Sequence, residues 1–163
     1  WRDQVRTYAE ALGKAEEIDA RLAAIDERAK SLGAQAGEGT FAVVRWMKNG
    51  PMVMNASLMP GQILQAAGLK PVQLATELGD KGHSDPLSLE NLSQIDADYV
   101  FIATFNADGK AAFEEARSQP AFTRLDAVKR DSVAVVAGGV WSSSSGPIAA
   151  EQVLNDIEAL LNK

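Results

Sequence analysis

Cysteine is absent from the sequence, and histidine occurs only once, at His83. Without cysteine the chain can form no disulfide bond, no zinc–thiolate site and no thiol nucleophile. With one histidine, a site that binds zinc or manganese ions directly is not expected, because such sites need several nitrogen or oxygen ligands. The absence of cysteine fits an oxidising compartment as well as a reducing one, so it assigns neither.

Long apolar runs and excess positive charge are also missing. No apolar stretch approaches the roughly 18 residues that cross a membrane. The 16 Lys and Arg residues are outnumbered by 22 Asp and Glu residues, giving a net charge of −6, so a nucleic-acid partner is not expected. The glycine-rich motifs that hold nucleotide phosphates are absent too. What remains is a chain of 163 residues, 46% of them hydrophobic, which suits one domain with a real core.

The longest predicted element is an amphipathic helix over Trp1–Leu32. This segment has no proline and one glycine, Gly13, and its apolar residues recur every three or four positions. At 1.5 Å per residue the helix would be roughly 45–48 Å long, about as long as the domain is wide. Its early turns would then pack on something outside this chain; alternatively the helix lies along one face of the domain, or pairs as a coiled coil.

After a flexible linker at Gly33–Gly39, strand and helix signals alternate. Strands are predicted at Phe41–Met47, at Met52–Asn55 after an Asn49-Gly50 hairpin turn, around Val72–Leu74, and as buried runs at Asp98–Ala103 and Ser132–Ala137. Helices are predicted at Pro60–Ala67, Ser88–Ile95, Gly109–Ser118, Pro120–Leu125 and Pro147–Leu161, with a loop over Gly138–Gly146. The order predicts an α/β fold, a three-layer Rossmann-like lobe with a small, mostly parallel sheet and helices on both faces.

Catalysis would have to depend on His83-Ser84-Asp85, in the predicted loop before a helix. A Ser-His-Asp triad would have to use this histidine, the only one in the chain. The composition of the segment favours an exposed turn instead. Asp96 and Asp98 precede a strand and are interpreted as capping residues rather than as an acid–base pair.

Binding has more support, because ligands in open α/β sheets lie outside the carboxyl ends of the strands. Three such ends are predicted, at Asn55–Met59, Thr104–Asn106 and Val140–Ser143. They combine apolar bodies with neutral polar tips, a mixture that suits a bulky small molecule. For Phe105 and Trp141, binding and packing are both open interpretations. Arg45 is either a cation at the end of a strand or a ligand contact.

Five stretches together resemble the C-terminal lobe of the periplasmic binding proteins that deliver ferric siderophores, haem or cobalamin to ABC importers. In order, the similar stretches are the interlobe helix at Trp1–Leu32, LMPGQILQAAG at Leu58–Gly68, the S-x-E and D-x-D pattern of Leu87–Ile102, Pro120–Val136 with Phe122 where Trp is common, and the loop Val140–Pro147. No motif is decisive alone, but the order of the five is specific, and it covers essentially the whole chain.

The resemblance implies a long interlobe helix over residues 1–32, a ligand-binding lobe over residues 33–163, and an N-terminal lobe that is not in this chain. Ligand would lie between the two lobes. The family's ligand contacts fall here on Leu58, Met59, His83, Ser84, Phe105, Asn106, Trp141 and Ser142. Glu90 matches the exposed glutamate that docks on the permease. Because these loops lack the Arg and Tyr that grip anionic catecholates, a neutral or mixed-ligand siderophore is favoured, and a strongly anionic one would depend on the missing lobe.

The resulting expectation is the C-terminal half of a solute-binding protein that captures a ferric siderophore and delivers it to an ABC permease. It would have no catalysis and no cofactor beyond its iron–siderophore cargo. It would work in the periplasm or on the outer face of the cytoplasmic membrane, free or lipid-anchored and peripheral to the membrane. The alternatives are a haem or cobalamin binder of the same architecture, and a small α/β enzyme fragment that uses His83 and Asp85.

Overall fold

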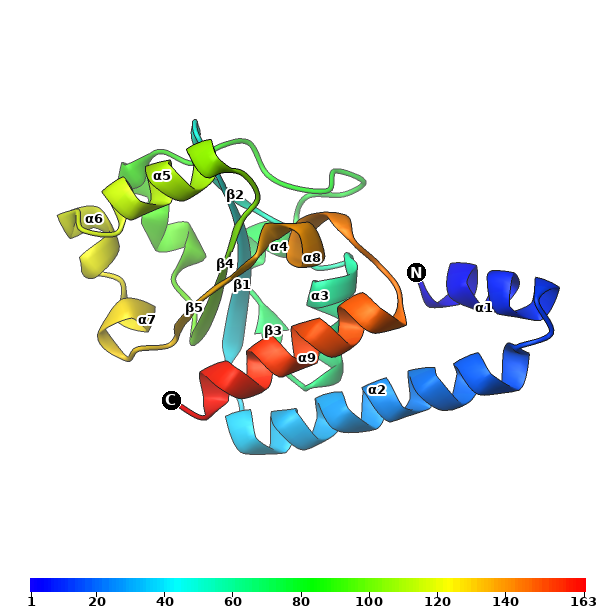
Figure 1. Ribbon diagram of the computed structural model, residues 1–163. Helices are drawn as coiled ribbons and strands as arrows, with labels where there is room; N and C mark the ends of the chain where they lie inside the picture. The colour runs from blue at the N-terminus through cyan, green and yellow to red at the C-terminus, as the bar shows by residue number, and fades with distance from the viewer.

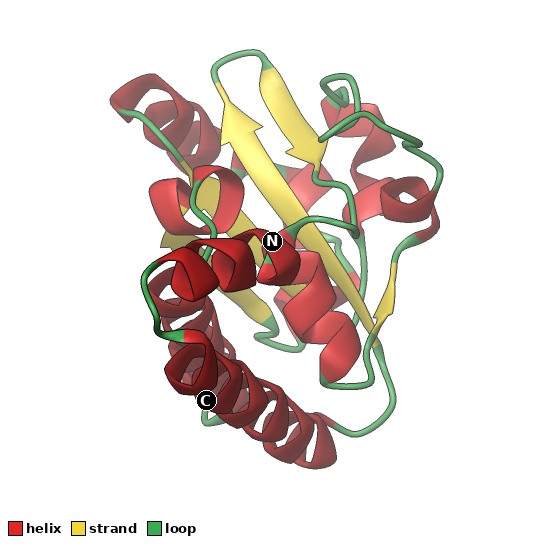
Figure 2. Cartoon of the chain, turned by 90° about the vertical axis from the view of Figure 1, so that its right-hand side faces the viewer, coloured by secondary structure: helices red, strands yellow, loops and turns green.

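A computed structural model describes all 163 residues of the chain, from Trp1 to Lys163. The predicted single N-terminal helix is wrong: the segment forms two helices, α1 (Arg2–Ala11) and α2 (Ala15–Ala36). The break is at Gly13, whose φ of +68° lies in the left-handed region that only glycine adopts without strain. Figures 1 and 2 show α1 turned back beside α2.

Ion pairs hold α1 in this folded-back position. The Arg6 guanidinium lies 2.8 Å from an Asp19 carboxylate oxygen, and Arg2 pairs with Asp26 further along α2. The early turns therefore pack on the same chain, although Tyr8 remains 61% exposed.

The sheet has four parallel strands and one antiparallel strand. They are β1 (Thr40–Met47), β2 (Gly50–Val53), β3 (Lys70–Pro71), β4 (Tyr99–Thr104) and β5 (Val133–Ala137). The order is β2-β1-β4-β5, with the short β3 also paired to β1, and only β2 runs antiparallel. The predicted hairpin at Asn49-Gly50 is confirmed, because Met47 pairs with Gly50 across the turn.

Helices cover both faces of the sheet, which confirms the predicted three-layer α/β lobe (Figures 1 and 2). One face carries α2, α3 (Met59–Ala66), α8 (Gly138–Ser143) and α9 (Pro147–Leu161). The other carries α4 (Gln73–Thr76), the 3-10 helix η1 (Leu89–Ile95), α5 (Ala107–Ala116), α6 (Pro120–Thr123) and α7 (Asp126–Lys129). Alternation along β1 divides the core: Phe41 and Val43 face the first layer, and Val44 and Trp46 face the second.

Four local predictions are corrected. The loop expected over Gly138–Gly146 begins with helix α8, and the strand expected near Val72 is β3, two residues earlier. The run at Ser132–Ala137 is a strand but lies at the sheet edge, where Val135 is 53% exposed. Gly33 belongs to α2 rather than to a linker, since it is the point where α2 packs on Ala67. None of the helices combines the length and the apolar character that crossing a bilayer requires.

Candidate functional site

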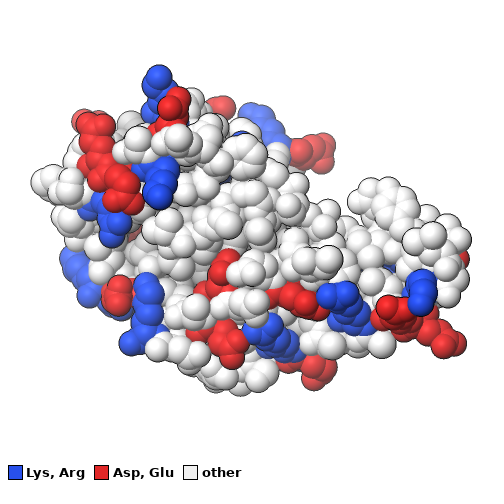
Figure 3. All heavy atoms as spheres, viewed as in Figure 1, with Lys and Arg blue, Asp and Glu red and all other residues white.

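A pocket of about 260 Å³ opens between the start of α3 and the connection from α8 to α9. It is lined by Trp1, Ser57, Leu58, Met59, Pro60, Gln62, Trp141, Ser142, Ser143, Ser144 and Ser145. Four of the eight predicted ligand contacts, from two segments distant in the sequence, thus meet in one place. No charged residue lines this pocket, and Figure 3 shows an uncharged surface over α8. We call it the serine pocket.

Several polar groups of the serine pocket are not used by the protein itself. The Ser142 hydroxyl donates to the Gly138 carbonyl at 2.6 Å, and the Ser144 hydroxyl donates to the Gly139 carbonyl at 2.8 Å. In contrast, the hydroxyls of Ser57, Ser143 and Ser145 make no hydrogen bond within the chain, and all three residues are exposed. They can donate to or accept from a neutral oxygen-rich ligand.

Asn55 fixes the loop that leads into the pocket. Its amide nitrogen donates to the carbonyls of Gly79 and Lys81 at 2.9 and 2.8 Å, and its amide oxygen accepts from the Ser57 N–H at 2.8 Å. Asn55 is 8% exposed. It is therefore a positioning residue for the start of α3, and not a free polar tip.

The two tryptophans of the serine pocket differ in burial. Trp141 is 1% exposed, stacks on Phe101 with ring centroids 4.6 Å apart, and donates its indole N–H to Asp156 at 2.7 Å. It forms a fixed wall of the pocket. Trp1 is half-buried, and its indole N–H is sealed from solvent without a hydrogen-bond partner. The helix pattern alone assigned Trp1 no role, because its proximity to α8 is a tertiary contact.

Phe105 and Asn106 follow β4 and lie outside the serine pocket. Phe105 is 48% exposed, and the guanidinium carbon of Arg45 lies 5.1 Å from its ring centroid. Asn106 caps α5, with its side-chain oxygen accepting the Gly109 N–H at 2.8 Å.

His83 and Ser84 lie on the loop that runs beside the end of β2. The Ser84 hydroxyl accepts the Val53 N–H at 3.0 Å and donates to the Asp85 carbonyl at 2.8 Å, so Ser84 is buried and fastens the loop to β2. His83 is exposed, and its Nδ1 bonds the Ser84 carbonyl. No hydrogen bond joins His83 to Asp85, and no group of three or more His, Cys, Asp or Glu residues is arranged to hold a metal ion. A triad is not assembled here.

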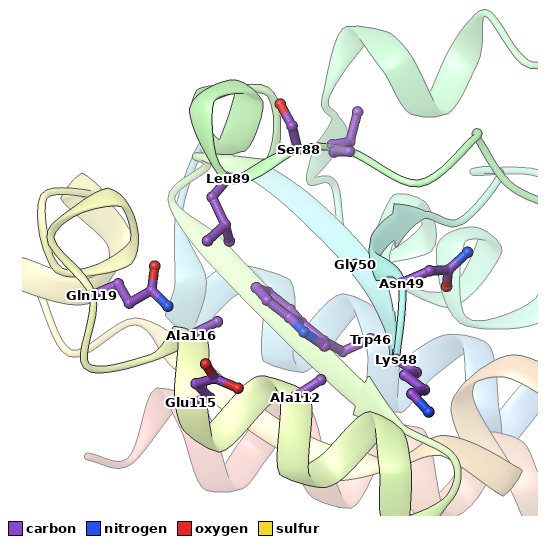
Figure 4. A pocket seen from close by; sticks show the side chains of 11 residues that line it. Trp46, Lys48, Asn49, Gly50, Ser88, Leu89, Ala112, Glu115, Ala116 and Gln119 are labelled. Atoms are coloured by element: carbon purple, nitrogen blue, oxygen red, sulfur yellow. The ribbon is translucent and has the colours of Figure 1, made fainter.

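A second recess, of about 300 Å³, lies on the opposite face of the sheet (Figure 4). Trp46 forms its floor, between the β1–β2 turn at Lys48 and Asn49 and the helix face that carries Glu115. It contains none of the predicted ligand contacts. Leu89 borders it, and the next residue, Glu90, is exposed in the first turn of η1.

Comparison with known proteins agrees with this architecture. The sequence model of the family described as periplasmic binding protein matches residues 1–137. The "Probable siderophore-binding lipoprotein YfiY" of Bacillus subtilis is 29% identical over 174 residues, which cover all of this chain and 54% of YfiY. The chain therefore spans about half the length of this curated relative.

Two solved structures share the fold. The crystal structure of SirA from Staphylococcus aureus superposes with a TM-score of 0.85 at 21% identity, covering 99% of this chain and 65% of SirA. FhuD2 from the same organism, with bound ferrioxamine B, gives a TM-score of 0.79 at 17% identity, covering 98% of this chain and 63% of FhuD2. SirA has also been solved in complex with staphyloferrin B.

Proposed function

Because this chain belongs to the periplasmic binding protein family, we propose that it is the C-terminal lobe of a solute-binding protein that captures a ferric siderophore between two lobes. The observation that carries the proposal is the serine pocket, where Leu58, Met59, Trp141 and Ser142 meet. The name of YfiY and the ligands of SirA and FhuD2 support an iron chelate as the cargo.

Within the serine pocket, apolar and hydroxyl groups would have separate tasks. Leu58, Met59 and the ring of Trp1 would cover the hydrocarbon part of the chelate, which removes apolar surface from water. The free hydroxyls of Ser57, Ser143 and Ser145 would contact its neutral oxygens. The pocket is open to solvent on one side, and the second lobe would close that side.

The remaining parts of the molecule fit delivery to an importer. Helix α2, 22 residues or roughly 33 Å long, would connect the lobes. The exposed Glu90 would dock on cationic side chains of the ABC permease. Delivery of this kind places the whole protein in the periplasm or on the outer face of the cytoplasmic membrane, where a lipid anchor would keep it near the permease. The chain would bind its cargo without catalysing a reaction, and this binding requires no resident cofactor.

Tryptophan fluorescence tests the proposal on the full-length two-lobed protein. We expect saturable quenching by one class of ferric siderophore in a panel that also contains haem and cobalamin. Trp1→Phe should remove most of the signal, because Trp1 is the half-buried tryptophan of the serine pocket. Saturation by haem or cobalamin would instead favour the alternative cargo, and flat traces across the panel would refute the binding function.

A charge placed in the serine pocket locates the site. Leu58→Glu puts a carboxylate against the bound chelate, and we expect affinity to fall at least about tenfold, the effect of one unpaired charge in a contact. Gln119→Glu is the matched control, because Gln119 is also half-buried but lines the recess on the other face. Equal affinities of the two variants would mean that the chelate binds elsewhere.

A further inference from the structure

We infer that Arg45 is a second ligand contact that receives a carboxylate group of the chelate, so that the cargo is a carboxylate-bearing siderophore rather than a neutral one. The inference rests on the proposed function and names the chemical class of its ligand.

Six of the eight arginines lie within 4 Å of a carboxylate oxygen. Among the half-buried ones, Arg2 pairs with Asp26 and Arg28 pairs with Glu158. Arg45 is half-buried too, yet it has no carboxylate partner, and its Nε is sealed from solvent without a hydrogen bond. The two terminal nitrogens of Arg45 also make no hydrogen bond within the chain, and unlike Nε they are not sealed, so an acceptor from outside the chain can reach them.

The neighbours of the Arg45 side chain are apolar or aromatic. Alternation along β1 puts its side chain on the face of Phe41 and Val43, between the cross-strand neighbours Met52 and Ala103. Phe105 lies under the guanidinium and is itself half-exposed. A ring face compensates part of the positive charge but accepts no in-plane hydrogen bond, so the planar fork stays available.

Helix α8 links this cation to the serine pocket. Its first residue, Gly138, packs directly on the backbone of Phe105, where an added Cβ would lie 2.7 Å from the Phe105 Cα. Its last turn carries Trp141 and Ser142, which line the serine pocket. A bulky chelate lying along α8 would therefore meet neutral hydroxyls at one end and a guanidinium at the other.

The serine pocket and Arg45, at the two ends of α8, favour a chelate that has both neutral oxygens and a carboxylate. A guanidinium fork matches the two oxygens of a carboxylate, and such charge-assisted pairs are stronger than neutral hydrogen bonds. The serine pocket, which has no lysine or arginine, favours neutral oxygens instead. A citrate-type chelate that combines hydroxamate arms with a carboxylate satisfies both ends, whereas a trihydroxamate without a carboxylate leaves Arg45 unpaired.

The test is a titration of the full-length protein with two probes, a ferric citrate-dihydroxamate chelate and a ferric trihydroxamate that has no carboxylate. Arg45→Gln should weaken binding of the first probe by roughly 10- to 100-fold, the effect of losing a hydrogen bond to a charged group. Arg45→Lys should recover part of that loss. Binding of the trihydroxamate should change by less than about twofold, as should binding of either probe to the control variant Arg124→Gln, an exposed arginine without a partner.

The outcomes separate the two proposals. If the wild-type protein binds chelates but Arg45→Gln weakens both probes equally, or neither, the role of Arg45 is refuted while the proposed function stands. Preference of the wild-type protein for the trihydroxamate refutes it as well. If the wild-type protein binds no iron chelate, both proposals fail. Thermal unfolding of each variant is measured in parallel, and Arg45→Met, which keeps the apolar stem, replaces any variant that unfolds early.

Discussion

Asp98 joins the starts of β1 and β4 through three hydrogen bonds. Its carboxylate accepts the Thr40 N–H at 2.7 Å and the Thr40 hydroxyl at 2.9 Å, and its own N–H donates back to that hydroxyl at 3.0 Å. These bonds hold the pKa of Asp98 below its ordinary value, since they favour the charged form. Such a depressed pKa stabilises the fold above the unfolded-state value of 3.8, and the stabilisation is lost as the pH falls through the folded-state value.

We expect Asp98→Asn to lower the free energy of unfolding by about 1 kcal/mol at pH 7, a modest value because the carboxylate is half-exposed. Urea unfolding at several pH values measures it. The difference from wild type should be constant above about pH 5 and should shrink below about pH 4. Asp80→Asn, in an exposed loop without side-chain bonds, is the control and should match wild type at each pH. A difference that grows in acid would contradict the assigned sign.

At the scale of single residues, the sequence predicts which polar residues follow the strands. It does not predict which of their side chains are already hydrogen-bonded within the chain. Asn55, Ser84 and Asn106 all have the polar side chains that suggest ligand contacts, and each is used to hold backbone groups. Two of the three partners of Asn55, the carbonyls of Gly79 and Lys81, lie more than 20 residues away, so no local pattern could reveal them. Arg45 shows the opposite case, because its missing partner is visible only when the whole fold is present.

The helices and strands were predicted well where the signal is local. The Asn49-Gly50 turn and the apolar run that became β4 depend on residues in contact along the chain. Helix α8 was missed because glycines and serines have weak helix propensity, and the helix depends on Trp141 stacking against Phe101. The edge position of β5 was also hidden, since a central and an edge strand can have the same apolar run.

Two glycines in helices should respond in opposite directions to alanine. A Cβ at Gly33 would lie 1.9 Å from the Ala67 carbonyl oxygen, so Gly33→Ala must push α2 away from the end of α3. We expect a loss of about 1–3 kcal/mol in the free energy of unfolding. Gly139, in α8, has no atom within 4 Å of its added Cβ, and alanine there should stabilise by up to about 1 kcal/mol.

Chemical denaturation of both variants measures this contrast. Equal, small effects would mean that α2 does not approach α3 as closely as the distance indicates. A stabilised Gly33→Ala would contradict the packing role and restore the interpretation of Gly33 as part of a linker.

At the scale of the whole molecule, α2 and α9 form one layer. Ile25, Ala29 and Leu32 of α2 belong to the same buried cluster as Leu154 and Ile157 of α9. Two ion pairs join the two helices beside this cluster, Arg21–Glu151 and Arg28–Glu158. The two arginines are seven residues apart on α2, and the two glutamates are seven residues apart on α9. Figure 3 shows a band of charges of both signs along α2. If α2 connects two lobes, we expect it to move with this lobe as one body.

The strength of that attachment can be measured with a double-mutant cycle at Arg28 and Glu158, whose nearest atoms are 2.6 Å apart. Each alanine variant should lose stability, and the double variant should lose less than the sum, with a coupling energy of about 0.3–1 kcal/mol because both side chains are more than a third exposed. High salt should reduce the coupling by screening it. Strictly additive losses would mean that the apolar seam alone holds α2, and lobe closure would then be free to shift the helix along α9.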